Sequence, residues 1–217
     1  MAISCEEIIN LLHQPAFGTL ATQSAAMPGY PFVTVLPFVL DQHHCPFFLM
    51  SGLAEHTKNL LTNPKASLLV FNPDNDNVQT GSRLTVVGEV GRFEPPAEQV
   101  RRYLRYHPDA ERYLALRDFA FFRLEPMRLR MIAGFGQMAW QEGRVLREAE
   151  ALSLSGEEQL IRALGSDREG SVKLLGIDRY GIDVMVTESR KREKFQHAPI
   201  ELAHVPDAAR ELIASLG

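Results

Sequence analysis

The hydrophobic pattern at the start of the chain predicts a short helix followed by β-structure. Ser4 and Glu7 have the spacing of a helix-capping box, and an apolar stripe follows over residues 8–12. This helix is expected to end before Pro15. The next segments are rich in β-branched and aromatic residues and are separated by turn-forming residues, so they predict three strands of an antiparallel meander, at residues 17–22, 31–40 and 46–51.

The middle of the chain continues this alternation of strands and short helices. The pattern predicts helices at residues 52–62 and 97–106 and, after the break at His107-Pro108, a second short helix to about residue 116. It predicts strands at residues 66–71, 82–93, 119–124 and 129–140. Gly88 and Gly91 inside the long strand predict a bulge or sharp bend, which is how a sheet curls into a barrel. Residues 1–145 are therefore expected to form an antiparallel β-barrel of six or more strands with helices at its edges.

The pattern changes again after Gly143. A second capping box at residues 155–158 predicts a helix to residue 164, followed by a helical segment to residue 175. A strand pair at residues 182–187 and 194–197 and a closing helix at residues 206–216, with Pro206 at its first position, complete this part. Residues 146–217 are therefore predicted to be a small α+β C-terminal domain, which makes the whole chain α+β.

Composition narrows the class of protein. The 217 residues are 45% hydrophobic and 23% charged, which is typical of a folded globular chain, and the net charge of −4 argues against nucleic acid as a partner. Cys5 and Cys45 form neither a Cys-x-x-Cys pair nor a Cys/His cluster, so we expect no disulfide framework and no structural zinc site. No basic residue precedes Lys58 and no apolar run approaches the roughly 20 residues of a membrane span, which favours a cytoplasmic protein with no membrane partner.

One segment has residues suited to binding an anion. Ser51 ends a predicted strand, and His56, Thr57 and Lys58 surround the start of the following helix, where free N–H groups and the helix dipole favour a phosphate. The alternative is that Ser51 merely ends the strand while His56 and Lys58 are solvated.

Other polar groups are expected to be structural. His43 and His44 lie on a predicted turn, where solvation is favoured over metal binding, and no metal site is expected. The eight arginines of residues 101–130 are interleaved with acidic residues, which favours a solvated helical face over an anion-binding wall. Hydrolase triads and glycine-rich phosphate loops are absent from the sequence.

Several motifs resemble those of a known superfamily. Four segments look like the FMN-binding split-barrel superfamily typified by pyridoxamine 5'-phosphate oxidase: residues 17–22, 29–32, 49–60 and 63–70. Four more are similar to its heme-utilisation branch, the HugZ and HutZ type: residues 83–88, 103–113, 119–126 and 134–140. The resemblance implies a split β-barrel homodimer with cofactor sites in clefts between the two barrels.

The resemblance also implies site residues and a flavin-dependent oxidoreductase. FMN would be held mainly by its phosphate, at Ser51, His56, Thr57 and Lys58. Its ring would lie against the strand that contains Val33, Thr34, Val35, Pro37 and Phe38, and Arg83 and Trp140 would approach the cleft. The oxidase has an Arg-Lys pair where this chain has Glu55 and His56.

Two other functions remain open at this stage. The first is a heme-binding or heme-degrading protein of iron utilisation, in which Arg83 would pair with a propionate or with a ligand bound to the iron. The branch has a His-Met-Asn-x-Asp-His motif where residues 163–168 read Ala-Leu-Gly-Ser-Asp-Arg, so His197 and His204 are the remaining C-terminal candidates for an axial ligand. The other function is a cofactor-free binding module.

Overall fold

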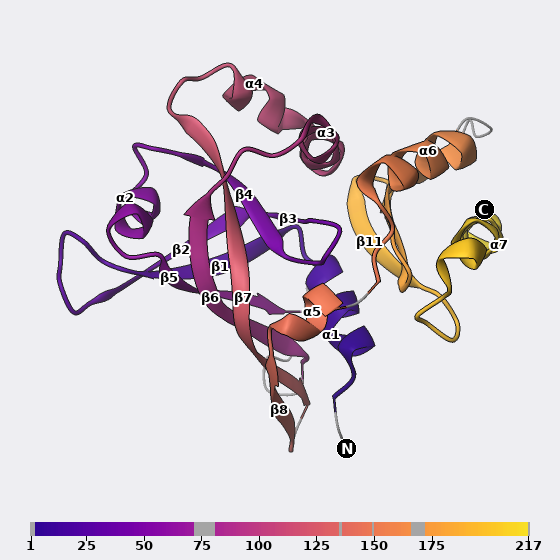
Figure 1. Ribbon diagram of the computed structural model, residues 1–217, viewed down its shortest axis with the longest axis horizontal. Coiled ribbons are helices and arrows are strands. Elements are labelled where there is room, and N and C mark those ends of the chain that lie inside the picture. Colours follow the sequence, from indigo (N-terminus) through magenta and orange to yellow (C-terminus); the bar gives the residue numbers. More distant parts are fainter. Residues whose placement is uncertain (1–2, 72–80, 135, 149, 166–171, 217) are drawn as a thin grey trace.

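The computed structural model describes residues 3–71, 81–134, 136–148, 150–165 and 172–216, and it contains two antiparallel sheets (Figure 1). The larger sheet has the strand order β2-β1-β5-β6-β7-β4-β3, with β8 paired to β7. Its strands are β1 (Phe17–Gln23), β2 (Pro31–Pro37), β3 (Val39–Leu40), β4 (Pro46–Ser51), β5 (Lys65–Phe71), β6 (Arg83–Arg92), β7 (Phe119–Gly134) and β8 (Gln137–Glu142).

The two ends of this sheet are joined by the chain itself. Strands β2 and β3 lie at opposite edges of the strand order, yet only Phe38 separates them in sequence. The sheet must therefore curl until its edges meet, which confirms the antiparallel split-barrel fold. The prediction of one strand over residues 31–40 is wrong in detail. Strand β2 ends at Pro37 in its pairing with β1, and after the fully buried Phe38 the chain passes to β3, which pairs with β4 instead.

The predicted bulge in the long strand is confirmed at Gly88. The pairing of β6 with β7 shifts between Val87, opposite Arg128, and Gly88, opposite Pro126. A side chain at Gly88 would collide with the Glu125 carbonyl, so this close approach requires glycine. Strand β7 runs without interruption over the segment predicted at 119–124 and into the one predicted at 129–140. The second prediction is wrong in detail, because β7 ends at Gly134 and a hairpin reverses the chain into β8.

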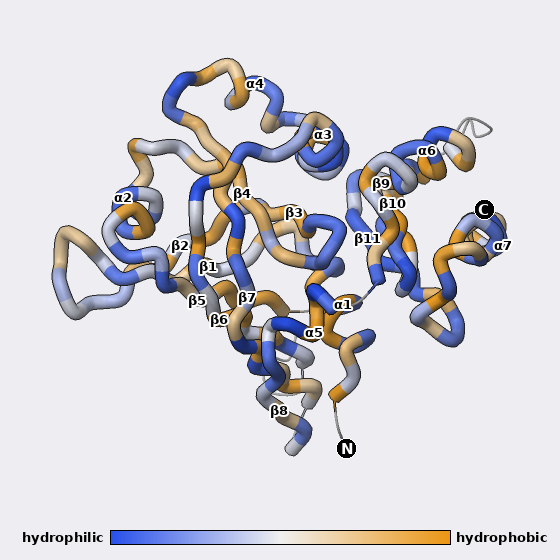
Figure 2. Tube along the Cα trace, in the orientation of Figure 1, coloured by the Kyte–Doolittle hydropathy of each residue, from blue (hydrophilic) through white to orange (hydrophobic). Residues whose placement is uncertain are grey.

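Helices cover the ends and edges of the barrel. They are α1 (Cys5–His13), α2 (Glu55–Thr62), α3 (Ala97–Tyr106), the 3-10 turn η1 (Pro108–Ala110), α4 (Glu111–Leu114) and α5 (Arg144–Glu148). The capping box of α1 is confirmed, since the Glu7 N–H donates to Ser4 Oγ and the Ser4 N–H donates to the Glu7 carboxylate. Figure 2 shows hydrophobic residues concentrated on the barrel strands, whereas α3 is largely hydrophilic. None of the described helices has the length and hydrophobicity needed to cross a bilayer.

The C-terminal part is a three-stranded sheet with the order β11-β10-β9. The elements of this C-terminal part are α6 (Leu154–Gly165), β9 (Val172–Ile177), β10 (Gly181–Val186), β11 (Ser189–Lys194), the 3-10 turn η2 (Leu202–His204) and α7 (Val205–Ser215). Helices α6 and α7 pack on the sheet around Ile177, Ile182 and Val184, on the side away from the barrel (Figure 1). Leu146 of α5 belongs to the barrel core, and the domain boundary at residue 145 stays a prediction.

Three C-terminal predictions are wrong in detail. Residues 172–175 begin a strand instead of ending a helix, and β11 starts at Ser189, because Thr187 and Glu188 have positive φ and form a tight hairpin. Helix α6 starts before Ser155, and Ser153 accepts the Gly156 N–H. The closing helix with proline in its first turn is confirmed.

Candidate functional site

The outer face of the barrel sheet is a continuous surface formed by six strands. Residues directly opposite each other on antiparallel strands share a face, and these rows alternate with core residues such as Leu68 and Val86. We define the outer face by two such rows: Val35, Thr19, Leu69, Thr85, Arg130 and Trp140, and beside them Val33, Ala21, Ser67, Val87, Arg128 and Glu142.

Much of the outer face is apolar and exposed. Val33 and Val35 on the edge strand β2 are 56% and 66% exposed, and Trp140 is 48% exposed. A groove of about 540 Å³ crosses β1, β5 and β6, with Ala21 and Val87 among its lining residues. This volume lies within the range of small-molecule sites, and exposed apolar surface of this kind marks binding surfaces.

Two arginines add positive charge at one end of the outer face. The guanidinium groups of Arg128 and Arg130 lie 4.9 and 5.5 Å from the centre of the Trp140 ring, within the range of cation–π contacts. Stacking on the indole holds both cations beside an exposed aromatic surface. This end of the face is therefore suited to a ligand that combines a flat apolar body with anionic groups.

The structure brings some of the predicted site residues onto this face. Arg83 pairs with Ile132 of β7, one row beyond the pair formed by Arg130 and Trp140. Val33 and Val35 point outward, whereas Thr34 and Pro37 are half-buried, and the Phe38 side chain lies wholly in the core, away from any ligand on the outer face.

The predicted phosphate-binding residues gather elsewhere, where β4 meets α2. The Thr57 hydroxyl is buried and has no hydrogen-bond partner among the described residues. His56 is half-buried, which lowers its pKa, and Lys58 is exposed. Ser51 lies opposite Phe119 at the start of β7, so it is far along this long strand from the outer-face arginines.

A carboxylate occupies the position beside Ser51. The Ser51 hydroxyl donates to Asp118 Oδ2 at 2.6 Å and accepts a hydrogen bond from the Leu53 N–H at 3.1 Å. Asp118 and Glu55 therefore place negative charge at the junction where a phosphate was expected. Repulsion between these carboxylates and a phosphate opposes anion binding here.

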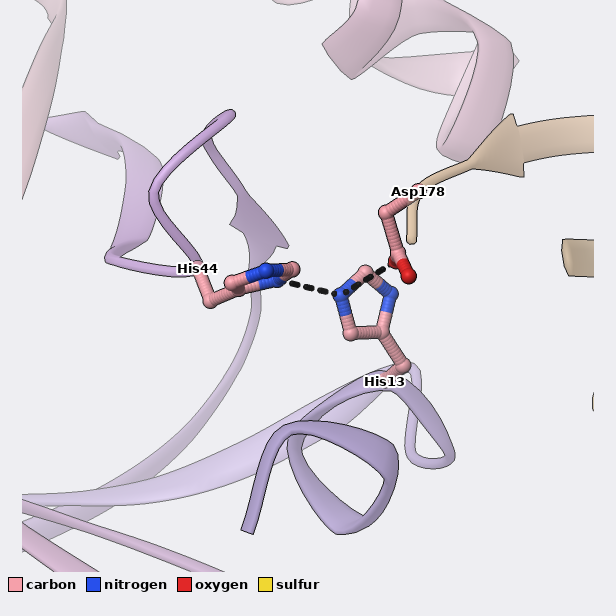
Figure 3. Close-up of side chains that lie close together, drawn as sticks. All are labelled: His13, His44 and Asp178. Atoms are coloured by element: carbon pink, nitrogen blue, oxygen red, sulfur yellow. Dashed lines mark hydrogen bonds and ion pairs between the residues drawn. The ribbon is translucent and has the colours of Figure 1, made fainter. Parts of the chain in front are cut away.

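Sequence reasoning missed a buried cluster of His13, His44 and Asp178 (Figure 3). His13 ends α1, His44 lies in the turn between β3 and β4, and Asp178 follows β9. His13 Nε2 lies 3.0 Å from His44 Nδ1 and 3.3 Å from Asp178 Oδ2. The cluster therefore joins the barrel to the C-terminal sheet.

The expectation that His44 is solvated is wrong, since its side chain is 4% exposed. The Asp41 carboxylate accepts the backbone N–H groups of His43 and Cys45, which tightens the turn, and His44 adopts a φ of 58°. Burial lowers the pKa of His44 to about 3, so its ring is neutral at pH 7.

A second layer of buried polar groups surrounds the cluster. Asp183 accepts hydrogen bonds from His13 Nδ1 at 2.7 Å and from the Tyr106 hydroxyl at 2.6 Å. Arg192 spans both carboxylates, donating to Asp178 Oδ1 at 2.7 Å and to Asp183 Oδ1 at 3.2 Å, and it also donates to Asn10. This pairing, together with His13, holds the pKa of both aspartates well below the usual range despite their burial.

The arginine-rich stretch is not simply a solvated face. Arg102 is buried on α3 and pairs with Glu157 of α6, which also accepts from Arg105. The sequence carries one signal of a buried histidine: His13 follows Ile9 by four residues and so continues the buried stripe of α1. His44 has no such local signal.

The C-terminal heme-ligand candidates are accessible. His197 and His204 are both exposed, and Glu201 is the nearest carboxylate to His204, at 3.8 Å. Asp167 and Arg168 of the motif-like segment lie outside the described residues.

Comparison with known proteins places the fold. A family model described as CREG, beta-barrel matches residues 9–143. The chloroplastic heme oxygenase HOZ of Arabidopsis thaliana is 34% identical over 145 residues, which are 66% of this chain and 44% of that protein. The heme oxygenase HutZ of Vibrio cholerae is 31% identical over 126 residues, or 55% of this chain and 71% of HutZ.

Similarity to solved structures extends over the whole chain. The structure of a heme binding protein from Mycobacterium smegmatis aligns with a TM-score of 0.63 and 24% identity, covering 99% of this chain and 98% of that one. This likeness concerns the fold. Taken with the family match and the strand order of the barrel, it leads to one conclusion: the chain belongs to the CREG β-barrel family and has an antiparallel split-barrel fold.

Proposed function

We propose that this protein binds heme on the outer face of its barrel and acts in heme utilisation in the cytoplasm. The observation that carries the proposal is the combination of an exposed apolar strip with Arg128, Arg130 and Trp140 at one end. Heme has a flat apolar macrocycle and two propionates, so apolar strands and stacked guanidinium groups complement it. Two relatives that cover much of the barrel are named heme oxygenases.

The same structure supports FMN less well. The phosphate of FMN would have to lie at Ser51, where the Asp118 carboxylate already accepts the serine hydroxyl. Removing that repulsion requires a change of conformation or of protonation. We therefore rank heme ahead of a flavin-dependent oxidoreductase, and both ahead of a cofactor-free module.

Bound heme would supply the iron and its redox chemistry, and the protein's residues would supply binding and orientation. Arg128 and Arg130 would pair with the propionates, and Val87 on the adjacent strand β6 would contact the macrocycle. The exposed His197 and His204, approaching from the second chain of the proposed dimer, are the candidates for the axial ligand. Oxidative heme degradation by dioxygen in the presence of a reductant is the activity that follows from the proposal.

The proposal includes a homodimer. Strand β2 is a sheet edge with exposed Val33 and Val35, and Phe17 on the neighbouring strand is 58% exposed. Unpaired edges and contiguous apolar surface are commonly covered by a second chain. We expect light scattering at micromolar concentration to give twice the chain mass of 24.4 kDa. A single monomeric species would count against the dimer.

Hemin titration tests the heme site. Following the Soret band, we expect saturable binding by the wild type and affinity about tenfold or more weaker in Arg130→Ala, because a charge-assisted hydrogen bond contributes about 1.5–3 kcal/mol. Arg112→Ala is the matched control, since Arg112 also stacks on an aromatic ring, that of Tyr113, at 4.8 Å but lies on α4.

The titration separates the alternatives. Wild-type affinity in Arg130→Ala and Trp140→Ala would show that heme does not bind at the outer face. A purified protein that carries a yellow flavin and quenches FMN fluorescence at equimolar ratio would favour the oxidoreductase. Loss of the Soret shift in His197→Ala or His204→Ala would identify the axial ligand.

A further inference from the structure

We propose that His13, His44 and Asp178 form a binding site for one divalent transition-metal ion of the zinc type, separate from the heme face. The three donor atoms come from α1, the β3–β4 turn and the residue after β9, and all lie within 4.8 Å of one another (Figure 3). An ion bound there would take ligands from both the barrel and the C-terminal part, and would link them.

The donor spacing suits a tetrahedral ion. Zinc bonds to nitrogen and oxygen are about 2.0–2.1 Å, so two ligands of a tetrahedral site lie about 3.3 Å apart. His13 Nε2 is 3.0 Å from His44 Nδ1 and 3.3 Å from Asp178 Oδ2. The third pair, His44 Nδ1 and Asp178 Oδ2, lies within 4.8 Å, so an ion would draw these two atoms together by up to about 1.5 Å.

The hydrogen-bond donors and acceptors of the cluster also favour a bound metal ion. His13 Nδ1 faces the Asp183 carboxylate at 2.7 Å, so Nδ1 carries the proton and a neutral ring presents the lone pair of Nε2 to the cluster. His44 can donate one proton to that lone pair. Asp178 Oδ2 then has no hydrogen-bond partner among the described residues, although it is buried. A metal ion would satisfy Nε2 of His13, Nδ1 of His44 and this oxygen together.

The surroundings resemble the outer shell of a metal site. A ligating histidine usually donates its other N–H to a carboxylate, which is the contact between His13 and Asp183. Arg192 neutralises one of the two carboxylate charges and binds only their Oδ1 atoms, leaving Asp178 Oδ2 free to turn toward the histidines.

Space for a fourth ligand is present beside the cluster. A cavity of about 10 Å³ is lined by His44, Asp178, Arg102 and Glu157 among others. This is about the volume that one water molecule needs and far below that of a porphyrin. The site therefore suits three protein ligands and one water, and it excludes heme.

Cobalt(II) is the probe for the full-length protein freed of heme and dialysed against EDTA. We expect one equivalent of cobalt to bind with the intense visible bands of four-coordinate geometry, and zinc to displace it. His44→Gln and Asp178→Asn should lose these bands. His43→Gln, in the same turn, is the matched control and should keep them. Asp183→Asn should weaken cobalt binding about 10- to 100-fold, the usual effect of losing such an outer-shell partner.

The alternative is a His13 ring held protonated between the two aspartates, with no metal. That reading is correct if the wild type gives no four-coordinate cobalt spectrum, or if His44→Gln and Asp178→Asn bind cobalt as the wild type does. Circular dichroism shows whether these variants fold. If they do not, X-ray absorption of the zinc-loaded wild type decides, because the proposal requires two imidazole ligands in the zinc shell, and a shell without them overturns it.

Discussion

Asp183→Ala is expected to lower the free energy of unfolding by about 3–5 kcal/mol, the usual cost of removing one partner of a buried ion pair. Asp183 is fully buried, and its loss leaves Arg192, His13 and the Tyr106 hydroxyl without their shared acceptor. Urea denaturation in EDTA, followed by circular dichroism, measures the change without a contribution from metal.

Asp207→Ala is the control for this variant. Asp207 also pairs with an arginine, Arg210, at 2.7 Å, but both side chains are exposed on α7. An exposed pair contributes about 1 kcal/mol at most. If Asp183→Ala cost no more than Asp207→Ala, the buried network would not be what joins the C-terminal sheet to the barrel.

Acidification from pH 7.5 to pH 5 is expected to destabilise the protein by about 2 kcal/mol through His44 alone. Its folded pKa of about 3 lies below the unfolded value of about 6.5, so between these values the unfolded chain binds a proton that the folded chain does not. Each pH unit below about 6.5 therefore costs about 1.4 kcal/mol. Burial also lowers the pKa of His13, His56 and His107, which act in the same direction.

Urea denaturation at a series of pH values in EDTA measures this dependence. His44→Gln should flatten the curve between pH 6.5 and pH 5 because the group that titrates is gone. His204→Gln should leave the curve unchanged, since His204 is exposed in the folded protein. An identical pH dependence in wild type and His44→Gln would contradict the buried, neutral state of this ring. The buried Asp41, whose pKa is raised, opposes the trend toward lower pH, so the range above pH 5 is the informative one.

The elements that sequence predicts well are those set by local chemistry. The capping box of Ser4, the bulge at Gly88 and the proline at the start of α7 depend on neighbouring residues or on backbone sterics. The elements that it predicts poorly depend on distant partners. Strand β11 reads as a run of polar and charged residues, and Arg190 and Arg192 find acceptors on α1, β10 and the turn after β9.

The residues of the candidate sites also separate into those that the sequence could predict and those that it could not. Arg83 and Trp140 could be placed near one surface because the motif resemblance orders the strands that carry them. The cluster of His13, His44 and Asp178 could not be predicted, because Asp178 follows the two histidines by more than a hundred residues and meets them only after the C-terminal sheet docks. Burial of His44 also depends on the turn geometry that Asp41 creates.

The long sequence separation within the buried network affects how the chain matures during translation. His44 and Arg192 are 148 residues apart, so at about 5–20 residues per second the ribosome needs roughly 7 to 30 seconds to reach Arg192 after His44 has been made. Until Asp178 and Asp183 are made, His13 and His44 lack their acidic partners. The network can therefore close only late in synthesis, and a chain that terminated before β9 would leave His13 and His44 without their carboxylate partners.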